Sequence, residues 1–304
     1  MASALVNVSN ELAGIVERLA PHVASIHARR HYPSSGLLWA PDVIVTSDHT
    51  IQREEDISIT FADGKTTAAN LAGRDSGSDL AVLKLAAPVA SGVPLVRSDS
   101  PKAGELALVL GRSPDSGVNA SLGIVSAVSG QWRTWRGGQL DSYIRLDAKL
   151  FPHSSGGAVV NARGELIGIA TDSLSRIAGI AVPVATVARV TQKLLEKGFV
   201  PRGYLGVGIQ PVALPEQLLK SLSLSGRSGL MVLMVEPDGP ADKAGVLIGD
   251  ILVSVDDTTV EHPEDLQKYS DSGVIGKRAT ARFVRGGTIK ELSITVGERP
   301  RRSA

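Results

Sequence analysis

Short apolar runs rich in Val, Ile and Leu recur between residues 22 and 181, each bounded by Gly, Pro, Ser or Asp. Their spacing of about 8–15 residues is typical of the strands of an all-β sandwich or barrel. Ten or more such strands exceed one small sheet, so we expect a mostly β fold with a double antiparallel β-barrel. The runs are 36–39, 43–46, 57–61, 80–85, 106–110, 123–128, 143–146, 158–160, 166–170 and 179–182.

Two segments with helical spacing flank the strand-like region. Residues 10–20 predict a short amphipathic helix that Pro21 ends, and residues 183–197 predict a second helix. The second helix is expected to bury a single apolar face. That face consists of Val184, Val187, Val190 and Leu194.

The run Gly198-Phe199-Val200-Pro201 breaks the second helix and predicts a domain boundary. We expect a first domain over 1–198, a linker over 199–202, a second domain over 203–298 and a tail over 299–304. About 100 residues suffice for an independent core, so the second domain is expected to be a small α+β fold. Its strand-like runs are 203–209, 229–235, 251–255, 279–284 and 290–296, and its helical patterns are 240–244 and 263–269.

Composition narrows the classes of partner. The formal net charge of +1 gives no reason to expect nucleic acid or an anionic membrane surface. The absence of cysteine excludes disulfides and thiolate metal sites, and no apolar run approaches the roughly 18 residues that span a bilayer. Residues 1–10 lack the basic region and apolar core of a secretory signal. We therefore expect a cytoplasmic chain, or the mature or truncated form of an exported one.

Three polar positions at the edges of predicted strands carry the strongest chemical signal. They are His49, Asp79 and Ser155, the last within Ser154-Ser155-Gly156-Gly157. A serine nucleophile needs a base to take its proton, an anion to orient that base, and amide N–H groups aimed at the developing oxyanion. His49 fits the base because imidazole titrates near neutrality, and Asp79 fits the orienting anion.

Each of these residues alone has a plainer interpretation, as a structural histidine, a turn aspartate or a flexible loop. The chain order His, Asp, Ser is the order of serine proteases built on two β-barrels. Taken together, the three residues favour a protease-like site. We expect the backbone amides of His153 and Ser155 to form the oxyanion hole, with Gly156 and Gly157 allowing a tight turn.

With these segments identified, the chain resembles the HtrA/Deg family of trypsin-like serine proteases with one C-terminal PDZ domain. The resemblance extends over about residues 12–298. It implies unfolded or damaged protein substrates, a role in protein quality control and assembly as a homotrimer. The segments that carry it in the first domain are 44–49, 78–84, 123–127, 147–160 and 179–183.

Two positions depart from the family's pattern near the nucleophile. The family usually has Gly-Asn there, where this chain has His153-Ser154, and Phe151 stands in place of a usual asparagine. His153 keeps the amide donor but restricts the backbone conformations that a glycine leaves open. These departures imply a slow or regulated enzyme, or an inactive one.

The second domain resembles PDZ domains in the segments 202–207 and 239–252. In this interpretation, consecutive N–H groups of a Gly-containing loop bind a C-terminal carboxylate, and the peptide adds as a strand beside 205–209. The expected peptide-binding residues include Leu266, which either faces the peptide or belongs to the core. The others are Tyr204, Leu205, Gly206 and Val207.

The sequence therefore predicts a serine endopeptidase that needs no metal or other cofactor, with a second domain that binds C-terminal or extended peptides. The main alternative is a catalytically weak or inactive PDZ-bearing scaffold or chaperone that binds exposed protein C-termini. A third interpretation is an esterase or acyltransferase on the same barrels. Loss of activity on replacement of Ser155 would separate the enzymes from the scaffold.

Overall fold

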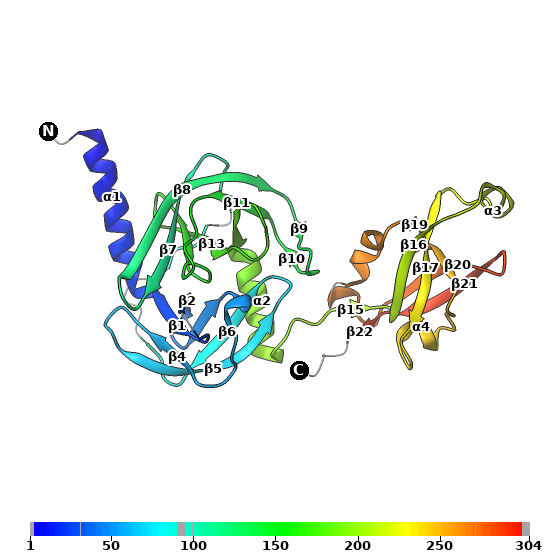
Figure 1. The fold of residues 1–304 in the computed structure, drawn as a ribbon, viewed down its shortest axis with the longest axis horizontal. Helices are drawn as coiled ribbons and strands as arrows, with labels where there is room; N and C mark the ends of the chain where they lie inside the picture. Colours follow the sequence, from blue (N-terminus) through cyan, green and yellow to red (C-terminus); the bar gives the residue numbers. More distant parts are fainter. Residues whose placement is uncertain (1–2, 31, 90–94, 99, 271, 300–304) are drawn as a thin grey trace. The chain divides into compact units, whose positions relative to one another are not determined.

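The computed structural model describes residues 3–30, 32–89, 95–98, 100–270 and 272–299, and the chain divides after Val200 into two compact units. Figure 1 shows both units, the first coloured from blue to green and the second from yellow-green to red. Of the tail predicted over 299–304, only Arg299 belongs to the described residues. Within these ranges, no helix is both long and apolar enough to cross a membrane.

The first unit contains, in its described residues, two closed barrels of antiparallel strands, which confirms the expected mostly β fold. The first barrel has the strand order β1-β2-β3-β6-β5-β4 and the second has the order β11-β14-β13-β12-β7-β8. The first comprises β1 (Val23–His27), β2 (Ser34–Ala40), β3 (Val43–Thr46), β4 (Ile57–Thr60), β5 (Thr66–Asp75) and β6 (Leu80–Leu85). The second comprises β7 (Leu106–Ser113), β8 (Gly117–Ser129), β11 (Tyr143–Asp147), β12 (Ala158–Asn161), β13 (Leu166–Thr171) and β14 (Gly179–Pro183). A separate pair consists of β9 (Trp132–Arg133) and β10 (Gln139–Leu140).

Alternation of side chains along the strands explains why so many strands read as continuous apolar runs. In β3, Val43 and Val45 enter a cluster shared by both barrels, whereas Ile44 between them enters the interior of the first barrel. In β12, Val160 joins the shared cluster and Val159 enters the interior of the second barrel. Since successive side chains point to opposite faces, strands beside the shared cluster are buried on both.

Helix α2 (Val184–Lys197) packs on the shared cluster through the face predicted from the sequence. All four expected residues of that face are buried there. Gly198 ends the helix at φ +77°, a left-handed conformation that glycine adopts without steric cost.

The first helix is longer than predicted. We expected it over 10–20, but α1 (Ala4–Leu19) begins earlier and is followed by the 3₁₀ turn η1 (Ala20–His22). The Ser3 hydroxyl accepts a hydrogen bond from the Val6 N–H at 3.4 Å and caps the additional turns. Amphipathic spacing does not reveal these turns, because their apolar side chains are exposed: Leu5, Val6 and Val8.

Replacing Leu194 with alanine is expected to lower the free energy of unfolding of the first unit by about 2–5 kcal/mol, because its fully buried side chain would leave a cavity. The neighbouring Leu195 is 43% exposed, so Leu195→Ala is a matched control with an expected change within about 0.5 kcal/mol. Tryptophan fluorescence in urea measures this unit alone, since all the tryptophans lie before residue 200. Equal midpoint shifts in the two variants would contradict the burial of Leu194 in the shared cluster.

The second unit is a small α+β domain whose sheet has the order β16-β17-β18-β20-β21, with β16 at one edge. Pro211 lies in β16, opposite Leu230. The helical pattern at 240–244 forms α4 (Pro240–Lys243), and the one at 263–269 forms a 3₁₀ helix, η3 (Pro263–Ser270), rather than an α-helix. The strands are β15 (Gly203–Tyr204), β16 (Val207–Ala213), β17 (Ser228–Val235), β18 (Ile251–Val255), β19 (Thr258–Thr259), β20 (Arg278–Arg285), β21 (Thr288–Thr295) and β22 (Gly297–Glu298). The remaining helical segments are α3 (Glu216–Leu222) and η4 (Ser272–Val274).

Candidate catalytic site

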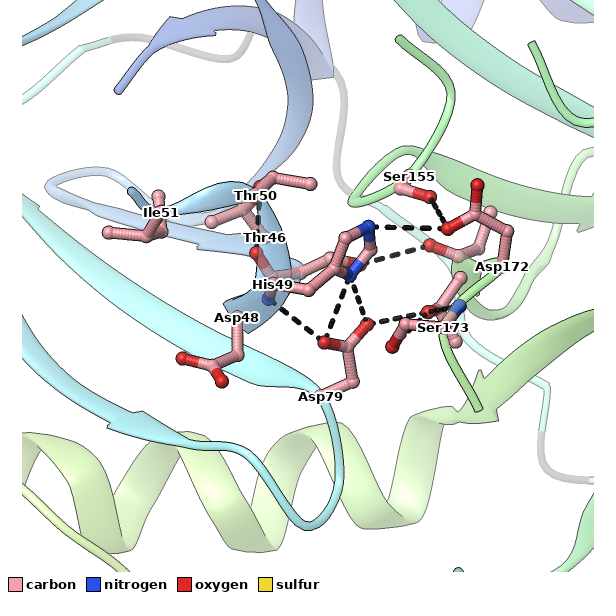
Figure 2. Close-up of polar contacts among 12 residues, drawn as sticks. Thr46, Asp48, His49, Thr50, Ile51, Asp79, Ser155, Asp172 and Ser173 are labelled. Atoms are coloured by element: carbon pink, nitrogen blue, oxygen red, sulfur yellow. Dashed lines mark hydrogen bonds and ion pairs between the residues drawn. The ribbon is translucent and has the colours of Figure 1, made fainter. Parts of the chain in front are cut away.

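The residues predicted to act together come from three separate loops of the first unit. His49 lies in the 3₁₀ turn η2 (Asp48–Thr50) after β3, Asp79 lies in the turn before β6, and Ser155 lies in the loop between β11 and β12. Figure 2 shows their side chains converging on one place. The fold thus brings together segments that are widely separated in the sequence.

Asp79 holds the imidazole of His49 from one side. The Nδ1 atom of His49 lies 3.0 and 2.9 Å from the two carboxylate oxygens of Asp79, and the His49 backbone N–H donates to Oδ1 at 3.0 Å. Because a carboxylate only accepts hydrogen bonds, the proton sits on Nδ1 and the Nε2 atom faces the opposite way. This is the orientation that a base needs to reach a serine on its far side.

Asp79 is fully buried and is held by a further donor. The Thr171 hydroxyl, at the end of β13, donates to Asp79 Oδ2 at 2.5 Å. Burial alone would raise the pKa of Asp79, but the hydrogen bonds and charge of His49, with the bond from Thr171, lower it below its usual value. The carboxylate therefore stays ionised beside the imidazole.

A second carboxylate, that of Asp172, lies between the imidazole and the predicted nucleophile. Asp172 Oδ1 is 3.2 Å from His49 Nε2, and it accepts a hydrogen bond from Ser155 Oγ at 3.0 Å. Figure 2 shows this arrangement, with His49 between the carboxylates of Asp79 and Asp172. The Ser155 hydroxyl consequently donates to Asp172 and not to His49.

The two carboxylates change the basicity of His49. Burial by itself lowers the pKa of the imidazole, but the hydrogen bonds to Asp172 and Asp79 and the charges of both outweigh it and raise the pKa to about 9. The same contact with His49 lowers the pKa of Asp172. The site is therefore an imidazolium between two carboxylates at neutral pH.

The loop that presents Ser155 turns sharply at Gly156. Its φ is +87°, and a Cβ built on it would lie 2.1 Å from the Ser35 carbonyl oxygen and 2.4 Å from the Thr46 hydroxyl. A side chain would be excluded both by the backbone conformation and by lack of space. The glycine that follows Ser155 is thus required by the packing of this loop against β2 and β3.

Ser35 of β2 ties the nucleophile loop to the rest of the first unit. Its hydroxyl donates to the His153 carbonyl at 2.6 Å and accepts from the Arg112 N–H at 2.9 Å. Its backbone N–H donates to the Ser155 carbonyl at 3.2 Å. This one residue therefore fixes the loop on both sides of Ser154.

Ser35→Ala is expected to lower the free energy of unfolding by about 1–3 kcal/mol and to reduce turnover, because it leaves the buried Arg112 N–H without its partner and releases the His153 carbonyl. The adjacent Ser34 offers a matched control. Its hydroxyl is also buried, yet it has no hydrogen-bond partner among the described residues, so Ser34→Ala is expected to be neutral or stabilising. Urea unfolding of the two variants tests the difference, and equal losses would contradict the role given to Ser35.

The amides around Ser155 divide into two groups. Those of Ser154, Gly156 and Gly157 donate to carbonyls of Phe151, Ala170 and Ser154, at 2.8 to 2.9 Å. For the amides of His153 and Ser155, no described residue provides an acceptor. These two are the donors that the sequence predicts for the oxyanion hole.

The two unusual side chains of this loop lie next to each other. The rings of Phe151 and His153 stack with centroids 6.0 Å apart and an interplanar angle of 5°. Burial and the nearby charge of Arg29 lower the pKa of His153. Arg29 also donates to the Pro152 carbonyl at 2.7 Å, which adds a second tie to the loop.

In the second unit, the predicted peptide-binding loop joins β15 to the edge strand β16. Gly206 has φ +77°, and the Leu205 and Gly206 carbonyls accept from Ala241 and Glu236. Leu205 and Leu266 lie in one apolar cluster, each 8% exposed, with Val207 packed against it. Leu266 therefore belongs to the core of this domain. Tyr204 is part of the β15–β22 pair, opposite Gly297.

Sequence reasoning missed Asp172 and Thr171. Both come at the end of the run predicted as a strand over 166–170, where a Thr-Asp-Ser sequence looks like an ordinary turn. The available signal in the sequence was their position at the end of a predicted strand that follows the Ser155 loop in the chain.

Comparisons with known proteins agree with the fold of both units. Residues 34–169 match the family described as trypsin-like peptidase domain, and residues 203–296 match the PDZ domain. The solved structure titled "HtrA-type protease AlgW with tripeptide" is 31% identical, superposes with a TM-score of 0.70, and the match covers 95% of this chain and 98% of that one. The structure of a serine endoprotease from Yersinia pestis is 29% identical, with a TM-score of 0.72 and coverage of 96% and 98%.

A curated relative extends further than this chain. A "probable periplasmic serine endoprotease DegP-like" of Brucella suis is 33% identical over 282 residues, which is 90% of this chain but 54% of the relative. The chain therefore spans about half the length of the curated relatives it matches.

Proposed function

Since the chain belongs to the HtrA-type proteases, with a trypsin-like peptidase domain followed by a PDZ domain, we propose that it is a serine endopeptidase acting on unfolded or damaged proteins. Ser155 attacks the scissile carbonyl, His49 is the general base and Asp79 orients it. The observation that carries the proposal is the buried Asp79 carboxylate on His49 Nδ1. On the opposite side, Nε2 lies 3.2 Å from Asp172 Oδ1, the atom that also accepts from Ser155 Oγ.

The chemistry follows the usual order for acyl transfer by serine. His49 Nε2 takes the Ser155 proton as the Oγ–carbon bond forms, and then gives it to the leaving amine. The negative charge that develops on the carbonyl oxygen is stabilised by the amides of His153 and Ser155. Throughout these steps, Asp79 and Thr171 keep the imidazole in one orientation.

The second unit is proposed to bind C-terminal or extended peptides. An edge strand has unpaired N–H and C=O groups, and β16 provides such an edge beside the Gly206 loop. The HtrA-type structures titled with a bound tripeptide or decapeptide support a peptide ligand.

Assembly as a homotrimer is also proposed. Three apolar side chains of α1 support an assembly surface, since Leu5, Val6 and Val8 are 81%, 48% and 45% exposed. Light scattering after size-exclusion chromatography tests the stoichiometry, and a monomeric mass at micromolar concentration would reject the trimer.

A PDZ-bearing scaffold without proteolytic activity is the second candidate function. The hydrogen bond from Ser155 to Asp172 favours it, because the nucleophile is not aligned with its base in this arrangement. The retention of His49 and Asp79 in contact opposes it.

Cleavage of reduced casein, combined with labelling by a fluorophosphonate, tests the proposed activity. We expect cleavage that the reagent blocks, with its phosphonyl group found by mass spectrometry on Ser155. Cleavage that continues after full labelling of Ser155 would reject the assignment of the nucleophile. Absence of both cleavage and labelling over the whole range from pH 6 to pH 10 would favour the scaffold.

A further inference from the structure

The catalytic site contains a carboxylate that the chemistry of a serine nucleophile does not need. Asp172 Oδ1 lies 3.2 Å from His49 Nε2 and 3.0 Å from Ser155 Oγ, in the space between base and nucleophile. Its side chain is 55% exposed, whereas the side chain of Asp79 is fully buried. The imidazole of His49 thus contacts a buried carboxylate through Nδ1 and a solvent-accessible carboxylate through Nε2.

We propose that Asp172 is an inhibitory residue of the catalytic site, which keeps the enzyme at rest by bridging His49 Nε2 and Ser155 Oγ. This proposal rests on the endopeptidase function proposed above. Activity then requires that His49 lose its second proton, or that the bound substrate displace the Asp172 side chain.

The proton on Nε2 prevents His49 from acting as a base. An imidazolium cannot accept the Ser155 proton, so only the neutral form of His49 is active. With a pKa of about 9 for His49, only about 1% of the enzyme carries a neutral imidazole at pH 7. The Asp172 bridge therefore removes most of the active form near neutrality.

The hydroxyl of Ser155 is also directed away from the base. Its proton points to Asp172 Oδ1, so it must turn toward Nε2 before transfer. Asp172 is a poor substitute base, because the hydrogen bond from His49 lowers its pKa below the usual aspartate value. The contact blocks the reaction instead of assisting it.

The exposure of the Asp172 side chain allows it to leave the bridge. Because its side chain is half exposed, it can turn into solvent without leaving a buried, unpaired charge. Arg29, after β1, lies within electrostatic reach of Asp172. Asp79 has no such freedom, since three donors hold it in a closed environment.

Few charged groups surround His49 in the part of the chain that the structure describes, so the titration of His49 can be assigned. Asp79 and Asp172 act on it directly. Arg29 and His153 lie on the side of Asp172 and the nucleophile loop. Asp48, the residue before His49, is engaged by Arg74 at 2.5 Å.

Asp172→Asn tests the bridge, because asparagine keeps the shape and an acceptor for Ser155 but removes the charge. We expect the pKa of His49, followed by NMR of labelled histidine, to fall from about 9 toward 7. The rate of fluorophosphonate labelling of Ser155 at pH 7 is expected to rise roughly tenfold or more, and to differ less than about twofold at pH 10. His49→Gln identifies the signal of His49 among the six histidines.

Asp63→Asn is the matched control. It removes the same charge from the exposed turn between β4 and β5, where Asp63 pairs with Lys65 at 2.9 Å. We expect it to change neither the titration of His49 nor the labelling rate. Asp172→Ala provides a second variant that removes shape and charge together, and tryptophan fluorescence confirms that each variant is folded.

Three outcomes decide the question. An unchanged titration of His49 in Asp172→Asn would overturn the bridge, whatever the enzyme does to casein. A lowered pKa of His49 without faster labelling at pH 7 would overturn the inhibitory role. Faster labelling in Asp172→Asn with casein intact in every variant would support the bridge while rejecting the endopeptidase function, so the two proposals fail separately.

Discussion

Ser155→Ala is expected to reduce cleavage of reduced casein by about 10⁴-fold or more, since removal of the nucleophile in a serine triad leaves only the catalysis that binding and the oxyanion donors provide. The variant should fold normally, because the Ser155 hydroxyl makes its hydrogen bond to the half-exposed Asp172. The measurement is the initial rate of peptide release, made at pH 9 so that His49 is substantially neutral.

Ser154→Ala is the matched control for this experiment. Ser154 is equally buried in the same loop, and its hydroxyl accepts from the Phe151 N–H at 3.2 Å without contacting His49. We expect a loss of less than about tenfold, as for a single hydrogen bond that supports the loop. Equal cleavage by native chain and Ser155→Ala would mean that another protein, or another residue, performs the hydrolysis.

Asp79→Asn is expected to lower kcat by about 10⁴-fold with little change in KM. Asp79 accepts hydrogen bonds from His49 Nδ1, the His49 N–H and the Thr171 hydroxyl. The asparagine amide offers one oxygen in place of two and turns its NH₂ group toward a donor. To accept from that NH₂ group, His49 must place its proton on Nε2, where it can no longer act as a base toward Ser155.

Steady-state kinetics on a peptide substrate measures this effect. Thr171→Val, which removes one of the three donors and keeps the carboxylate, is expected to lose far less, roughly tenfold. A loss in Asp79→Asn no greater than that of Thr171→Val would contradict the role of Asp79 in setting the tautomer. A large rise in KM at constant kcat would indicate that Asp79 contributes to substrate binding and not to catalysis.

The parts of the fold that could be predicted from the sequence are those with strong side-chain patterns. Strands buried on both faces, such as β3 and β12, appear as short apolar runs. By contrast, β1 (Val23–His27) and β5 (Thr66–Asp75) were not predicted. Only three of the ten residues of β5 are buried and its first half carries Thr, Ala and Asn, so only its pairing with β4 and β6 identifies it as a strand.

The site divides in a similar way. The sequence indicates His49, Asp79 and Ser155 as candidates because their chain order and flanking strands are informative together. The sequence does not indicate Asp172, because its contacts are with Ser155 and His49, which lie 17 and 123 positions away in the chain. A half-exposed aspartate after a strand is common, and no local pattern distinguishes one that turns inward.

The proline in the edge strand β16 limits how long an added strand can be. Pro211 lies in the middle of that strand and has no N–H to donate. A peptide that starts pairing near Gly206 therefore cannot form regular backbone hydrogen bonds along the whole of β16. The same interruption makes the edge of β16 a poor template for pairing between copies of the chain. The domain can therefore keep this edge open for short peptides and still resist aggregation.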